Sequence, residues 1–142
     1  MKQVALVACV WLALVACSTR RQPSSVLTGP SGGRLITADM IEASGATTAW
    51  DALRRTVPNI SFRETSRGTP ARVVRRGRSS IYLNDQPRVV LDGATLSDFQ
   101  VLDQIPARDV FSIEVLSGIH GTTYYGTGAA NGVILIRTRT AP

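Results

Sequence analysis

The sequence predicts a single α+β domain in which short helices come first and strands follow. Three observations support this prediction: helical apolar spacing with capping residues between positions 37 and 58, strand-like runs that stop at Asp-Gly or Gly, and an uninterrupted β-branched and leucine run at Val133–Ile136. Elements that are segregated in this way favour α+β over a parallel βαβ sheet. The chain has 142 residues, which is the length of one domain.

Two helices are expected near the start of the folded part. Thr37 is suited to cap a short helix over Ala38–Ala43, and Gly45 stands where helices commonly end in a left-handed residue. A second helix begins with the capping box Thr48-Ala49-Trp50-Asp51 and stops before Pro58. Its inward face would carry Trp50, Leu53 and Val57, and its outward face Arg54 and Arg55.

The remainder is predicted to consist of strands, turns and brief helical turns. Ile60–Phe62 is a short strand, Arg63–Thr69 is a polar loop, and Asp92-Gly93 is a turn. Helical turns are expected within Leu96–Ile105 and over Pro106–Val110. The other strand-like segments are Arg72–Arg76, Ile81–Leu83, Arg88–Leu91, Phe111–Leu116 and Val133–Ile136.

The charge balance is basic. Sixteen basic residues, nearly all arginine, face ten acidic ones, which gives a net charge of +6 with a mean hydropathy of +0.07. This composition excludes collagen-like, coiled-coil and wholly disordered chains, and the length excludes a channel-sized barrel. Basic domains often bind nucleic acid, but here the arginines are scattered and no basic stripe is interleaved with aromatic residues. The N-terminal residues also predict export from the cytoplasm, and an exported protein meets little nucleic acid.

The N-terminus carries an export signal. Val4–Val15 is an apolar run that is too short to span a bilayer, and it ends in Leu14-Val15-Ala16-Cys17. This segment resembles the lipobox of bacterial lipoproteins, which implies removal of residues 1–16 and lipidation of Cys17. Residues 17–34 are then expected to be the lipidated cysteine and a flexible tether, with a folded domain over 35–139 and a tail over 140–142. The alternative is an ordinary secretory signal or a short membrane anchor, with Cys17 incidental.

Two segments of the folded part carry a family resemblance. One is Val89-Val90-Leu91-Asp92-Gly93, and the other begins at Ile105-Pro106, includes Ser112-Ile113-Glu114-Val115-Leu116-Ser117-Gly118, and continues to Tyr125-Gly126 and Ala130-Asn131-Gly132-Val133-Ile134. They resemble the plug domain of TonB-dependent outer-membrane receptors. Arg76-Gly77 stands where that family has an Arg-Gly motif. The resemblance covers nearly all of residues 35–139 and implies a plug-like fold with a small mixed sheet.

In that family the plug fills a barrel built by the same chain, whereas this chain ends at Pro142. The resemblance therefore leads us to expect a plug without its barrel. Two departures from the family pattern accompany this expectation. Residues 18–34 lack a clear apolar segment for contact with TonB, and Ser117 stands where the family often has a basic residue that pairs with barrel carboxylates.

The candidate interaction residues come from these motifs, and no catalytic, cofactor or metal residue is predicted. Glu114 is interpreted either as a surface ion-pair residue, with Arg137 as the candidate partner, or as a contact to a protein partner. His120 is expected in an exposed loop, and Tyr125 is expected either at a binding tip or packed under glycine turns. The full candidate set is Arg76, Gly77, Asp92, Gly93, Glu114, Gly118, Tyr125, Gly126, Asn131 and Gly132.

The functional hypothesis is a non-enzymatic, plug-like lipoprotein on the periplasmic face of the outer membrane. Its partners would be the membrane, through the lipid, and a transport barrel or another envelope transport protein. One alternative is a small periplasmic enzyme that uses His120 and aspartates such as Asp92 in a cleft of the same fold. Another is a truncated receptor product without an independent role.

Overall fold

The computed structural model describes residues 27–75 and 86–140 of the protein. The predictions for the lipobox, Cys17, Arg76, Gly77 and the strand at 81–83 lie outside the described residues. The strands are β1 (Arg34–Thr37), β2 (Ile60–Glu64), β3 (Pro70–Arg75), β4 (Arg88–Leu91), β5 (Ala94–Thr95), β6 (Val110–Leu116) and β7 (Val133–Thr138). The helices are α2 (Ala38–Ala43), α3 (Ala49–Thr56), α4 (Val101–Gln104) and α5 (Gly118–Tyr125), with 3-10 turns η1 (Ala107–Asp109) and η2 (Thr127–Ala129).

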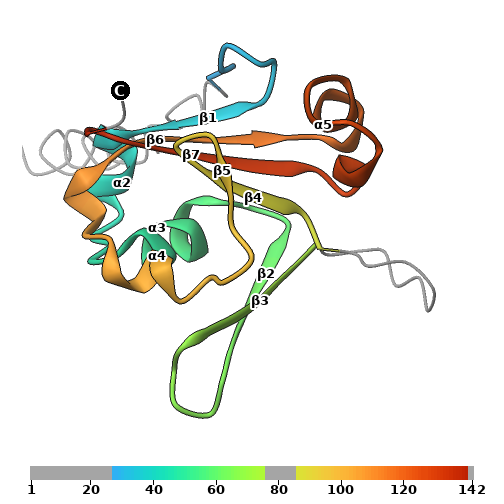
Figure 1. The fold of residues 1–142 in the computed structure, drawn as a ribbon. Coiled ribbons are helices and arrows are strands. Elements are labelled where there is room, and N and C mark those ends of the chain that lie inside the picture. Colours follow the sequence, from blue (N-terminus) through green and yellow to red (C-terminus); the bar gives the residue numbers. More distant parts are fainter. Residues whose placement is uncertain (1–26, 76–85, 141–142) are drawn as a thin grey trace, which may run out of the picture.

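Five of these strands form one mixed sheet in the order β1-β6-β7-β4-β5. Strands β4 and β7 are parallel, and the other neighbours are antiparallel. Strands β2 and β3 form a separate hairpin that projects away from the body of the domain (Figure 1). Helices α2, α3 and α4 cover one face of the sheet, and α5 lies at its end (Figure 1). The prediction of an α+β domain with a small mixed sheet is confirmed.

The main core lies between the sheet and helices α2 to α4. Ile36, Leu53, Leu102, Ile113 and Ile136 are among its fully buried members. A smaller cluster on the opposite face packs under α5 and η2. It consists of Val90, Leu116, Ala129, Val133 and Leu135, with Tyr125 against it. Both faces of β7 are therefore buried, as its continuous apolar run predicted.

Helix α3 begins as its capping box predicted. The Thr48 hydroxyl accepts a hydrogen bond from the Asp51 amide at 3.2 Å, and Asp51 Oδ2 accepts one from the Thr47 amide at 3.3 Å. Arg55 Nε donates to both carboxylate oxygens of Asp51 at 2.8 Å. Trp50 is buried, and Arg54 and Arg55 are exposed. The local sequence alone thus accounts for this helix.

The β2–β3 hairpin is attached to α3 through Trp50. The Trp50 ring meets Phe62 edge-on, with centroids 5.2 Å apart, and stacks on Phe99 at 6.5 Å. Its Nε1 donates to Glu64 Oε1 at 2.9 Å, and Arg54 pairs with the same oxygen. The polar loop predicted from Arg63 is wrong at its start. Strand pairing extends through Arg63 and Glu64, with a register shift between them, so the turn is confined to residues 65–69.

These contacts predict a specific loss of stability in acid. The hydrogen bond from Arg55 holds the pKa of Asp51 below its ordinary 3.8, and the indole of Trp50, followed by Arg54, holds the pKa of Glu64 below its ordinary 4.5. A carboxyl with a lowered folded-state pKa stabilises the fold above its unfolded-state value and loses that effect as the pH falls. We expect the urea concentration at the unfolding midpoint to decrease once the pH is lowered below about 4.5. This decrease should be smaller in the double variant Asp51→Asn/Glu64→Gln, which lacks both carboxyl groups. The control variant Asp39→Asn, at an exposed position on α2, should show the same dependence of the urea midpoint on pH as the wild type.

Two further predictions are corrected by the structure. Gly118 does not simply end the strand before it but is the first residue of α5, so His120 is helical and not in a loop. The tether predicted through Arg34 is structured from residue 27. Residues 27–33, which we call the strap, fold back along β1: the Leu35 amide donates to Leu27 O at 2.7 Å, and the Gly29 amide donates to Gly33 O at 2.8 Å.

Candidate functional site

The structure separates the predicted site residues into two groups. Asp92 and Gly93 lie at one end of the sheet, beside the end of β7. Gly118, Tyr125, Gly126, Asn131 and Gly132 gather at the other end, around α5 and the start of β7. Glu114 lies between them in β6. The motif residues are thus distributed along the sheet and do not converge on one reaction centre.

Asp92 fastens the turn that follows β4 to the end of β7. Asp92 and Gly93 have φ of 47° and 87°, as a two-residue hairpin turn of the primed type requires. The carboxylate of Asp92 accepts from the Thr138 amide and from the Thr138 hydroxyl, each at 2.8 Å. The turn prediction is confirmed. The Asp92 side chain has the further role of joining the turn after β4 to the last residue of the neighbouring strand β7.

At the opposite end, α5 is packed against the chain that leads into β7. A Cβ on Gly118 would overlap the Ala130 carbonyl oxygen, and one on Gly121 would lie 2.8 Å from the Ala129 oxygen. Ser117 caps the helix by accepting from the His120 amide at 3.4 Å. These glycines therefore permit close approach and are not positive-φ turns. The glycine-rich composition, which disfavours helices, hid α5 from sequence analysis.

Arg88 fastens the far end of α5, a role that sequence analysis missed. Its Nη1 donates to the carbonyl oxygen of Tyr125 at 3.2 Å, in the last turn of the helix. A cation at this position satisfies a free carbonyl and opposes the negative end of the helix dipole. Tyr125 is half-buried against the smaller core cluster, whereas Tyr124 is 60% exposed. The packed alternative for Tyr125 is thus the observed one.

Gly132 combines a positive φ of 97° with a crowded position, since an added Cβ would lie 2.7 Å from Leu116 O. Gly45, which ends α2 as predicted, has φ of 66° and open space around it. We expect Gly45→Ala to lower the free energy of unfolding by about 1 kcal/mol and Gly132→Ala by about 2 kcal/mol. Urea denaturation of the two variants measures the difference. Equal losses would show that the Leu116 contact has no energetic weight.

Glu114 is the most unusual side chain of the set. It is 4% exposed, and its Oε1 accepts from the strap amides of Ser31 at 2.9 Å and Gly33 at 3.1 Å. A Cβ on Gly29 would overlap its carboxyl group. The predicted surface ion pair with Arg137 is wrong: the ion pairs between described residues do not include Glu114. The strap covers the strand face that alternation had assigned to solvent.

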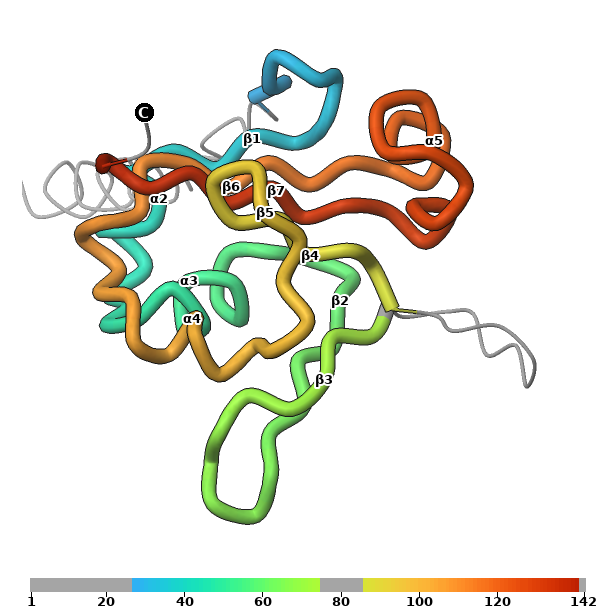
Figure 2. The backbone as a smooth tube through the Cα atoms, viewed as in Figure 1, coloured from blue at the N-terminus to red at the C-terminus, as the bar shows by residue number. Residues whose placement is uncertain are grey.

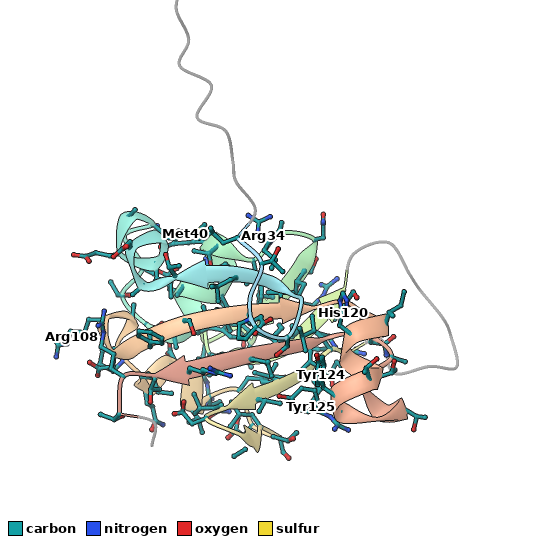
Figure 3. All side chains as sticks on the ribbon, turned by 90° about the horizontal axis from the view of Figure 1, so that it is seen from above. Arg34, Met40, Arg108, His120, Tyr124 and Tyr125 are labelled. Carbon is teal, nitrogen blue, oxygen red and sulfur yellow. The ribbon has the colours of Figure 1, made fainter. Side chains whose placement is uncertain are left out.

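The strap also lies against α5. Figure 3 places His120 at the N-terminal end of α5, and a Cβ on Gly32 would lie 3.3 Å from its Nε2. The other ring nitrogen, Nδ1, is 3.2 Å from the Ser117 hydroxyl oxygen. Close approach to Glu114 and Leu116 thus favours glycine at 29 and 33, and a positive φ of 78° favours glycine at 32. The sequence Gly29-Pro30-Ser31-Gly32-Gly33 was the available signal, and it resembled a linker.

A cavity of about 260 Å³ opens beside the ends of β6 and β7. Its polar lining is Arg34, Asn59, Ser117 and Asn131, over an apolar floor that includes Val115. Small-molecule sites usually start at about 300 Å³. The volume of this cavity is therefore small for a ligand pocket.

The residues of the enzymatic alternative lie far apart. Asp92 is bonded to Thr138 at the end of β7, whereas His120 follows the end of β6, which pairs with Val133. About 17 Å of strand therefore separates the two. Within residues 27–75 and 86–140 there is also no group of three potential metal ligands. In that same part of the chain, no helix has the length and apolar character needed to cross a membrane.

The sheet, its covering helices and the glycine turns define a small plug-like α+β domain. The family profile described as TonB-dependent Receptor Plug Domain matches residues 19–133. The chain belongs to this family, so the plug prediction is confirmed. It is 32% identical over 122 residues to TonB-dependent receptor P26 of Formosa agariphila, covering 84% of this chain and 12% of the relative. With TonB-dependent receptor SusC of Bacteroides thetaiotaomicron the identity is 29%, and the match covers 73% of this chain and 11% of the relative.

Solved structures show the same similarity. The RagAB peptide importer matches with a TM-score of 0.58 and 27% identity, covering 80% of this chain and 13% of that one. The ferric enterobactin receptor PfeA of Pseudomonas aeruginosa matches with a TM-score of 0.56 and 25% identity, and the match covers 82% of this chain and 18% of the receptor chain. This chain thus spans about an eighth of the length of the curated relatives. The curated relatives are named as TonB-dependent receptors, and the RagAB structure is named as a peptide importer.

Proposed function

We propose that this chain is a non-enzymatic plug module that is lipid-anchored on the periplasmic side of the outer membrane and binds a transport barrel or another envelope transport protein. The match of the plug profile to residues 19–133 is the observation that carries the proposal. The distribution of Asp92, Glu114 and Gly132 along the sheet supports a structural and binding role, because catalysis requires groups that converge on one point.

The sequence Leu14-Val15-Ala16-Cys17 supports the lipid anchor. More than one acyl chain gives stable anchoring, at about 0.8 kcal/mol per buried methylene. Radiolabelled palmitate should label the wild-type protein, and Cys17→Ala should abolish this labelling. Labelling that persists in Cys17→Ala would refute Cys17 as the lipidated residue, and an unlabelled wild type would refute the anchor; neither result bears on the binding role.

The binding role is tested by cross-linking in intact cells and by affinity capture from solubilised outer membranes. We expect a barrel or another envelope transport protein to be recovered with the wild-type chain. A periplasmic chain that carries a cleavable signal without the cysteine separates binding from anchoring. Recovery of no envelope protein above the level of an unrelated lipoprotein would contradict the proposal and favour a product without an independent role.

A further inference from the structure

The β2–β3 hairpin carries an arrangement of charges that the fold itself disfavours. Residues 60–75 contain four arginines and a single acidic residue, Glu64. In the antiparallel register Arg63 lies directly opposite Arg72, and both side chains are exposed. Directly opposed residues have Cβ atoms about 5 Å apart, and like charges in such a pair destabilise the ladder.

Nothing in the described part of the chain neutralises this pair. The carboxylate of Glu64 is occupied by Trp50 Nε1 and Arg54. The ion pairs among residues 27–75 and 86–140 involve Arg54, Arg55 and Arg108, and not Arg63 or Arg72. Phe62 and Val73, the next opposed pair, pack against the core, so alternation places Arg63 and Arg72 on the other, exposed face of the hairpin. A local rule broken at an exposed position, without internal compensation, is typical of a functional surface.

We propose that Arg63 and Arg72 form a docking site for an acidic segment of a protein partner. Two adjacent guanidinium groups present planar donor pairs that suit carboxylates. In an extended partner segment, carboxylates at alternate positions are about 7 Å apart, which is close enough for each to meet one arginine. The hairpin stands clear of the sheet, so a partner can reach its outer face (Figure 2). This inference goes beyond the proposed function and does not depend on the lipid anchor.

Fluorescence anisotropy tests the proposal with a labelled hexaglutamate peptide and the full chain in detergent. We expect Arg63→Gln and Arg72→Gln each to weaken binding about five-fold, the effect of one exposed carboxylate pair. The matched control is Arg108→Gln, an arginine whose side chain is 86% exposed outside the hairpin. It should bind as the wild type does. Binding that Arg108→Gln weakens equally would reflect net charge alone and would overturn the proposal.

A single variant that raises stability and abolishes peptide binding provides a sharper test. Arg63→Glu replaces a repulsive cross-strand pair with an attractive one, so its urea midpoint should rise while peptide binding is lost. An unchanged or lower midpoint, with native circular dichroism, would refute the repulsion. Tighter binding of inorganic phosphate or of anionic lipid vesicles than of the peptide, with the same dependence on Arg63 and Arg72, would reject a protein segment as the ligand.

Discussion

Replacement of Trp50 with alanine is expected to lower the free energy of unfolding by about 3–5 kcal/mol, the range for truncation of a large buried aromatic residue. Trp50 is 2% exposed and contacts two separate parts of the domain. It packs on Phe99 before α4, and it holds β2 through the Phe62 ring and the Glu64 carboxylate. Urea denaturation followed by circular dichroism measures the loss.

Two variants separate the roles of this side chain. Trp50→Phe retains a ring for Phe62 and Phe99 but removes the donor to Glu64, so it should lose less than Trp50→Ala. Val101→Ala truncates an apolar side chain that is 38% exposed, and it should change stability by no more than about 0.5 kcal/mol. A loss below about 1 kcal/mol for Trp50→Ala would mean that the hairpin is attached mainly by other contacts.

The Trp50 contacts also bear on the docking proposal. Arg63 and Arg72 lie on a two-stranded hairpin, and isolated hairpins are marginally stable in water. Attachment through Trp50 therefore helps to keep Arg63 and Arg72 in opposed positions on the hairpin. We infer that the hairpin is held from one face so that the other can remain free and basic.

Helix α3 and strand β7 were predictable because their signals are local. Thr48 and Asp51 specify where α3 begins, and Val133–Ile136 is apolar on both faces because both are covered. Helix α5 was missed because Gly118 and Gly121 are selected by contact with residues 129 and 130, and this tertiary requirement outweighs their poor helix propensity. The short strands β1 and β5 carried too few residues for a periodic signal.

In the candidate site, too, features with a local sequence signal were predicted and features that depend on distant residues were missed. The Asp92-Gly93 turn was recognised from a dipeptide, whereas the roles of Arg88 and Glu114 depend on residues far away in sequence. Alternation correctly placed Glu114 opposite Ile113, and Ile113 is fully buried. It could not show that a segment about 80 residues upstream covers the other face, since a pattern of period two describes one strand and not its neighbours.

Glu114→Ala is expected to release the strap from the sheet. The side chain accepts two amide hydrogen bonds on one oxygen, and bonds of amides to a carboxylate are worth about 1.5–3 kcal/mol each. If the strap stayed in place, the half-buried Ser31 and the buried Gly33 would each have an amide without this partner, so the strap should open into water. We expect a local loss of about 3 kcal/mol, which corresponds to a hundredfold or greater loss of hydrogen-exchange protection at these two amides.

The comparison with glutamine decides what the carboxylate contributes. Glu114→Gln keeps a carbonyl oxygen that can accept both amides, so the strap should remain closed with a smaller loss of protection. Glu42→Ala, at an exposed position on α2, should leave Ser31 and Gly33 unchanged. Full protection in Glu114→Ala would show that the strap is held by its own turn and by the Leu27–Leu35 bond. If protection is lost, the reach of the domain from the predicted anchor depends on Glu114, because an open strap would add residues 27–33 to the flexible tether predicted from the sequence.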